Sequence, residues 1–181
     1  MLVGIVCPGP SLAYWLGNRP PESHDLWIGV NVAARSWACH WWVCADAKPV
    51  RDGKAVGEPQ LFTQRQTATR FLHLKPDVDG CHTFEASLTE IPVETGWRRT
   101  SMTAAMILAE TLIGRTRPAE IRIYGCDWAK GAKYFNGETD ILGASPYRFE
   151  GEKHTYGQIA RWLAARNIEL TRMAVPQGVA A

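Results

Sequence analysis

The amino-terminal stretch LVGIVCPGPSL constrains the fold more than any other part of the chain. Residues 2–7 form an almost unbroken apolar run rich in β-branched side chains, which is typical of a strand buried on both faces of a parallel sheet. The Pro-Gly-Pro sequence at 8–10 forces a turn, and Ser11 stands where an N-cap hydroxyl would satisfy the free N–H groups of a helix. The stretch therefore predicts a strand, a tight glycine turn and a helix.

The same turn is a candidate anion site. Where a strand passes through a glycine into a helix, backbone N–H groups and the positive end of the helix dipole converge, so a nucleotide phosphate is a natural ligand. A single glycine is a weaker signal than GxGxxG or a Walker loop, neither of which occurs in the sequence. A purely structural strand-to-helix turn remains the alternative explanation.

Length and composition favour one globular domain. A chain of 181 residues can bury a proper core but is short for two domains, so we treat residues 1–181 as a single domain. A hydrophobic content of 46% and a charged content of 21% exclude disordered and fibrous classes. The net charge of +2 permits a local basic pocket but not the broad positive surface that is typical of a nucleic-acid-binding protein.

The sequence indicates a soluble protein with no membrane partner. It contains no run of about 20 apolar residues, and its first strand begins at once without a secretory leader, so we expect a cytoplasmic location. Three of the five cysteines lie in apparent strands, where a reduced thiol packs as a small hydrophobe: Cys7, Cys44 and Cys126. Four other residues do not match zinc-ligand spacing, so we expect no metal cluster from Cys39, His40, Cys81 and His82.

Apolar runs alternate with amphipathic segments along the rest of the chain. Strands are predicted at 26–31, 40–46, 120–127 and 168–173, and helices at 33–37, 101–114 and 152–166. The least regular part, 47–99, holds strand-like pieces at 60–63, 70–74 and 82–84, and we interpret it as an insertion over the active face. The pattern predicts an α/β fold, a three-layer Rossmann-like sandwich with a mainly parallel sheet and an irregular middle insertion.

Polar residues follow four of the predicted strands. They are Ser11, Asn31, Asp46 and Asp127. Because ligands of such folds bind at the carboxyl ends of the strands, we expect these residues on one rim. The start of the long helix adds the hydroxyls of Thr100 and Ser101, preceded by two arginines at 98–99 whose guanidinium forks suit phosphate.

Five short motifs follow one another in a recognisable order: GPSL at 9–12, GVN at 29–31, CAD at 44–46, TSMTAA at 100–105 and GCDW at 125–128. This order resembles a superfamily that contains the bacterial sialyltransferases and the 6-hydroxymethylpterin pyrophosphokinase-like domains, the latter also found in motility accessory factors. The resemblance covers most of the chain outside 47–99. Both branches share the GPSL turn, so it implies the fold and a nucleotide ligand more than one reaction.

The sialyltransferase-like branch implies a glycosyltransferase, which is the favoured hypothesis. It would take a nucleotide-sugar donor, need no cofactor and act on a saccharide, a small metabolite or a modified nucleic-acid base. His154 is the candidate general base, because an imidazole with a pKa near ~6.5 accepts a hydroxyl proton at neutral pH. The residues that would contact the nucleotide or its sugar are Gly9, Pro10, Ser11, Asn31, Thr100, Ser101, Gly125 and Trp128.

The pyrophosphokinase-like branch implies a different reaction. There, Asp46 and Asp127 would hold Mg²⁺ that bridges ATP phosphates, and diphosphate would pass to a pterin-like or other small hydroxyl compound. The chain departs from this branch at Trp128 and the Lys-containing loop after it, and it lacks that branch's helical extensions. The structural alternative is that both carboxylates cap the turns after their strands. A non-catalytic nucleotide-binding module is the third possibility.

Overall fold

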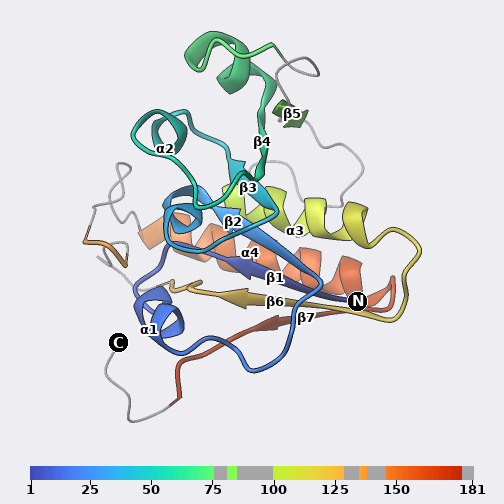
Figure 1. The fold of residues 1–181 in the computed structure, drawn as a ribbon. Coiled ribbons are helices and arrows are strands. Elements are labelled where there is room, and N and C mark those ends of the chain that lie inside the picture. The colour runs from blue at the N-terminus through green and yellow to red at the C-terminus, as the bar shows by residue number, and fades with distance from the viewer. Residues whose placement is uncertain (76–80, 85–99, 129–134, 138–145, 177–181) are drawn as a thin grey trace.

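A seven-stranded, all-parallel sheet forms the centre of the protein (Figure 1). The computed structural model describes residues 1–75, 81–84, 100–128, 135–137 and 146–176. Within these, the strand order is β5-β4-β3-β2-β1-β6-β7. The strands are β1 (Leu2–Val6), β2 (Leu26–Val30), β3 (Trp41–Cys44), β4 (Gln60–Gln64), β5 (Cys81–Phe84), β6 (Ala119–Tyr124) and β7 (Ile168–Arg172).

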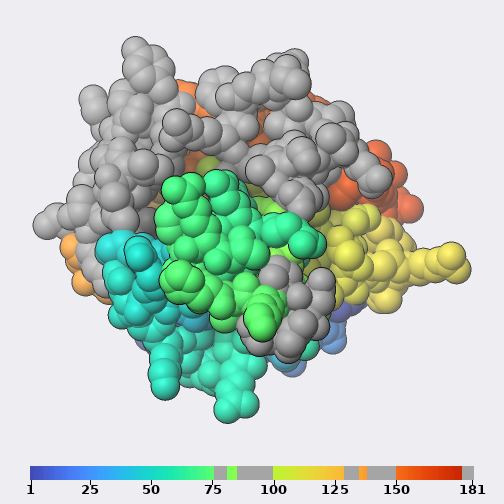
Figure 2. All heavy atoms as spheres, turned by 90° about the horizontal axis from the view of Figure 1, so that it is seen from above, coloured from blue at the N-terminus to red at the C-terminus, as the bar shows by residue number. Residues whose placement is uncertain are grey.

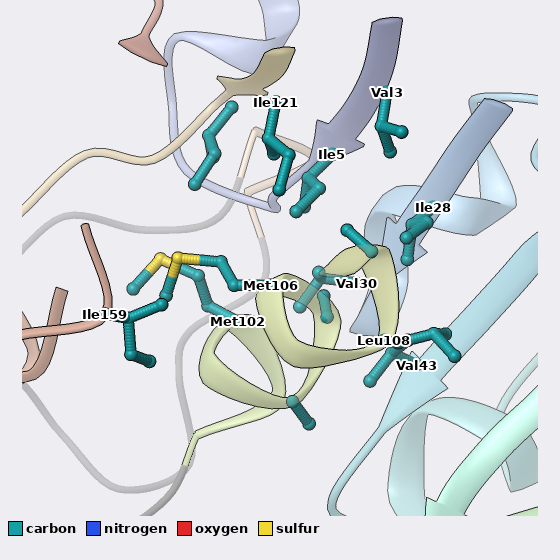
Figure 3. Close-up of a cluster of buried hydrophobic side chains, with 14 of the residues drawn as sticks. Val3, Ile5, Ile28, Val30, Val43, Met102, Met106, Leu108, Ile121 and Ile159 are labelled. Carbon is teal, nitrogen blue, oxygen red and sulfur yellow. The ribbon is translucent and has the colours of Figure 1, made fainter. Parts of the chain in front are cut away.

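Helical segments cover both faces of this sheet. They are α1 (Leu12–Gly17), the 3₁₀ segment η1 (Asn31–Arg35), α2 (Lys48–Arg51), the π-helical segment η2 (Thr67–Phe71), α3 (Ser101–Ile113) and α4 (Pro146–Ala164). Side chains alternate along β1, so Val3 and Ile5 join the cluster under α3 and α4, while Val6 joins the one under α1 and η1. Figure 3 shows side chains of α3 meeting those of β1, β2 and β6. The predicted three-layer α/β sandwich is confirmed.

The middle of the chain differs from the expectation in two ways. The strand-like pieces near 60–63 and 82–84 are strands, but they extend the sheet as β4 and β5 instead of lying over it. The prediction of a strand at 70–74 is wrong, because η2 occupies Thr67–Phe71. Residues 76–80 and 85–99, including Trp97 and the two arginines at 98–99, lie outside the described residues.

The carboxyl-terminal helix also differs from the expectation. Its start was predicted at residue 152, whereas α4 begins at Pro146, and it ends at Ala164. The long helix α3 was predicted closely, at 101–114, and it spans Ser101–Ile113. Thr100 caps it, and Gly114 follows it with a φ of 56°. Among the described residues no helix has the length and apolar character needed to cross a membrane. The five cysteines are unpaired, and all except Cys39 are buried.

An aromatic layer fills the space between the sheet and α1. Trp27 of β2 lies across Gly4 of β1, so closely that a Cβ at Gly4 would come to 2.2 Å from the Trp27 ring. The indole is also stacked on His24 at a centroid distance of 4.1 Å and tilted against Trp37 at 4.8 Å. The absence of a side chain at residue 4 is therefore what gives this layer its room.

His24 is the polar member of this layer. Its Nε2 lies 3.0 Å from the Tyr124 hydroxyl and its Nδ1 lies 3.1 Å from the Glu22 carbonyl oxygen. A neutral ring with its proton on Nδ1 satisfies both partners, donating to Glu22 and accepting from Tyr124. Burial lowers the pKa of His24, chiefly because desolvation penalises the charged ring.

We expect Gly4→Ala to destabilise the fold by about 1 to 3 kcal/mol, because the new methyl group must displace the Trp27 ring. Gly17→Ala is the matched control, since nothing lies within 4 Å of a Cβ built there. Urea unfolding of both variants measures the difference. Equal stability of the two would contradict the packing described for Trp27.

We expect the stability of the parent to fall as the pH is lowered from about 7.5 to about 5.5. The pKa of His24 is lower in the folded than in the unfolded chain. The stability that the neutral ring contributes is therefore complete above the pKa of the unfolded chain, and it is lost as the pH falls through the pKa of the folded chain. His24→Gln should flatten this part of the profile of urea midpoint against pH, and His82→Gln, at an exposed histidine, should not.

Candidate functional site

The four polar strand-end residues share one edge of the sheet. Ser11, Asn31, Asp46 and Asp127 follow β1, β2, β3 and β6, which are parallel and consecutive in the order β3-β2-β1-β6. Neighbouring strands lie about 4.8 Å apart, so this rim spans about 14 Å. The strand order reverses between β1 and β6, and in open α/β sheets that reversal is where ligands bind.

At the reversal, the ends of β1 and β6 are joined directly. The Gly9 N–H donates to the Gly125 carbonyl oxygen at 2.8 Å, and the Ser11 N–H donates to Asp127 Oδ2 at 2.7 Å. Ser11 itself has helical backbone angles and makes no side-chain cap. The predicted N-cap role of its hydroxyl is therefore wrong, because the Asp127 carboxylate accepts a hydrogen bond at the start of α1 in its place.

Two glycines make this junction possible. A Cβ at Gly9 would come to 2.4 Å from the Gly125 oxygen and 2.6 Å from Asp127 Oδ2. A Cβ at Gly125, where φ is +67°, would come to 2.2 Å from the Cys7 oxygen. Contacts within the chain thus account for both glycines. This agrees with the structural alternative, in which the turn and Asp127 serve the fold.

The Ser11 hydroxyl is the open polar group of the junction. Its oxygen is buried, the residue is only 8% exposed, and the described residues include no hydrogen-bond partner for Oγ. A buried hydroxyl without a partner is costly, so such an atom is usually satisfied by water or a ligand. The carboxylate beside it has a second oxygen, Oδ1, to which no described residue donates.

A second junction joins β2, β3 and α3. Ser101 Oγ donates to Asn31 Oδ1 at 3.0 Å and accepts from the Ala45 N–H at 2.8 Å. Asn31 has a φ of 50°, and its carbonyl oxygen accepts from Trp42 Nε1 at 2.8 Å. The predicted pair Asn31 and Ser101 is therefore brought together, but the buried Ser101 hydroxyl is used inside the frame.

The remaining predicted residues lie around these junctions. Thr100 accepts a hydrogen bond from the Thr103 N–H through Oγ1 at 3.3 Å and so caps α3. Asp46 is exposed after β3, three strand intervals from Asp127, so the two carboxylates cannot ligate one ion directly. His154 is exposed and lies well inside α4, instead of at the start of the helix predicted at 152–166.

Arg172 is a rim residue that sequence reasoning missed. It ends β7, its Nη1 donates to the Cys126 carbonyl oxygen at 3.2 Å, and its guanidinium lies 5.0 Å from the centroid of the Trp128 ring. Trp128 in turn meets Tyr156 of α4 edge-on at 5.3 Å. The signal was available, because Arg172 lies one residue before the end of the last predicted strand, 168–173, and the strand-end rule applies to that end as well.

Few side chains at this rim could bind a metal ion. Among the described residues no group of three or more histidine, cysteine or acidic side chains is arranged to hold a metal ion. Mg²⁺ does not need such a group, since it is usually held by one or two carboxylates together with substrate phosphates and water. Asp127, with one oxygen engaged and one open, fits that mode of binding.

Comparisons with known proteins add little. No protein-family model and no curated protein matches the sequence. Among solved structures, a thiamine pyrophosphokinase from Bacillus subtilis superposes with a TM-score of 0.41 and 16% identity, covering 96% of this chain. This chain spans 60% of the length of that one. At such a TM-score the similarity identifies no activity, so the residues of the rim must support any functional proposal.

We expect Ser101→Ala to cost about 1 to 3 kcal/mol of stability, because the partly buried Ala45 N–H and the Asn31 amide oxygen both lose their partner. Thr111→Ala is the matched control in α3: its exposed hydroxyl only donates to the Ile107 carbonyl oxygen, and its loss should change little. Thermal unfolding of the two variants and the parent measures both losses of stability. A smaller loss for Ser101→Ala than for Thr111→Ala would refute the bridging role.

Proposed function

We propose that this chain is a Mg²⁺-dependent transferase that binds a nucleoside triphosphate at the β1–β6 reversal and passes diphosphate to a small hydroxyl compound. The observation behind the proposal is the 2.7 Å hydrogen bond from the Ser11 N–H to Asp127 Oδ2. It brings a carboxylate to the place where a phosphate would otherwise meet the start of α1.

This carboxylate changes what the turn can bind. A phosphate set directly against the turn would lie beside the negative charge of Asp127 and would find the Ser11 N–H already engaged. A divalent cation between Asp127 and the phosphates removes that repulsion, and Mg²⁺ is commonly held in this way. When bound, Mg²⁺ would neutralise the charge that develops on the transferred group.

The chain's own residues supply the remaining contacts. The Ser11 hydroxyl, for which the described part of the chain contains no partner, can donate to a phosphate oxygen, and the Asn31 amide lies at the end of the neighbouring strand. Arg172 adds a guanidinium held in place by the Cys126 carbonyl and the Trp128 ring. A planar guanidinium fixed at two points suits recognition of phosphate oxygens.

The glycosyltransferase hypothesis receives less support. It places the donor phosphate at the Gly9–Ser11 turn without a metal, where the Asp127 carboxylate would oppose it. Its proposed base, His154, is exposed inside α4. No described contact favours this reaction over diphosphate transfer.

We expect the parent to bind ATP at least about tenfold more tightly with Mg²⁺ than with EDTA, as one charge-assisted contact is worth about that factor. Asp127→Asn should abolish the difference, while its amide oxygen still accepts from the Ser11 N–H and preserves the fold. Asp46→Asn is the matched control and should keep the Mg²⁺ effect. Isothermal titration calorimetry measures ATP binding by the parent and the two variants, with Mg²⁺ and with EDTA.

Two results would reject the proposal. One is tight binding of CMP, UDP or GDP sugars without Mg²⁺ by the parent together with no binding of ATP. The other is an Asp127→Asn variant that folds and binds ATP with an unchanged Mg²⁺ dependence.

A further inference from the structure

The β4–η2 arm, defined as residues 60–75, stands out from the rest of the molecule. Figure 1 shows it rising above the body of the sheet, and Figure 2 shows its residues uncovered in the middle of the face seen from above. The middle of the arm is tied to the end of β3, because Thr67 Oγ1 donates to the Ala45 carbonyl oxygen at 2.7 Å. The start of η2 therefore lies next to the Ala45–Asp46 segment, at one end of the rim.

The arm is uniformly basic. Residues 60–75 contain Arg65, Arg70 and Lys75, all exposed, and no acidic residue, while Asp77 and Asp79 follow them in the sequence. This is a local electrostatic footprint for a polyanion, without a broad positive surface.

An exposed aromatic ring lies among these charges. Phe71 is 45% exposed, which is unusual for a large apolar side chain, and the Arg70 guanidinium lies 5.3 Å from the centroid of its ring. The π-helical turn produces this display, since it buries Thr67 and Ala68 and closes with the Leu72 N–H donating to the Thr67 oxygen at 3.1 Å. An open ring beside a guanidinium can stack a base while the charge meets a phosphate.

We propose that the β4–η2 arm binds single-stranded nucleic acid. A single strand fits better than a duplex because the Phe71 ring needs an unstacked base, whereas basic side chains alone would accept either form. The bound strand would pass the Asp46 end of the rim, to which Thr67 ties the arm. This proposal concerns a surface beyond the nucleotide site and does not rest on diphosphate transfer.

The test uses fluorescence anisotropy with a labelled oligothymidylate and a duplex of equal length, in the absence of Mg²⁺ and ATP. The parent should bind the single strand more tightly than the duplex, and binding should weaken as salt rises. Phe71→Ala should weaken single-strand binding about tenfold or more, the range for one stacked base. Val56→Ala, at another exposed apolar residue outside the arm, should bind as the parent does.

A second pair of variants separates charge at the arm from charge in general. Arg70→Ala should weaken binding and reduce the slope of log affinity against log salt by about one. Arg115→Ala, at an exposed arginine after α3 on the opposite edge of the sheet, should leave the slope unchanged.

Three outcomes would overturn the proposal. They are the absence of single-strand binding, equal binding of duplex and single strand with no effect of Phe71→Ala, and equal losses in Arg70→Ala and Arg115→Ala. The second would indicate a general polyanion patch. Since neither ATP nor Mg²⁺ is present in this assay, its results are independent of the ATP-binding measurements on Asp127→Asn.

Discussion

The contact between the ends of β1 and β6 is the constraint on which the rest of the site depends. At this point the strand order reverses, and the Gly9 N–H reaches the Gly125 carbonyl oxygen. Neither residue can carry a side chain, because each Cβ would fall within 2.4 Å of a backbone oxygen of the other strand's end. This close approach brings Asp127 to the first turn of α1, where it accepts from the Ser11 N–H.

The chemistry proposed for the rim follows from that contact. A strand-to-helix turn normally offers positive potential to an anion, but here a carboxylate of the same chain already takes part of it. The Ser11 hydroxyl is left buried without a described partner, and Arg172 stands two strands away from it with its guanidinium fixed. A site with these charges can hold phosphates through a cation and a guanidinium together.

The two halves of the sheet carry different features. The β1, β6 and β7 ends gather Ser11, Asp127 and Arg172, whereas the β3 and β4 ends carry Asp46 and the basic arm anchored through Thr67. Between these halves lies the end of β2, which Ser101 joins to the end of β3, since its hydroxyl bridges Asn31 and Ala45. The fold thus places the proposed nucleotide site and the proposed nucleic-acid surface along one edge, a few strands apart.

The sequence alone determined the strands that bury both faces, the extent of the helix α3, and the polar residue after each of β1, β2, β3 and β6, because apolar periodicity and turn chemistry are local. It did not determine that α4 starts at Pro146, since the PYRFEG stretch carries the proline and glycine typical of a loop. Tertiary structure decided which polar groups meet: Asp127 and Ser11 are 116 residues apart, and Ser101 and Asn31 are 70 apart. The physical reason is that the partner of a strand-end group depends on which strand lies beside it, and only the order of the folded sheet fixes that neighbour.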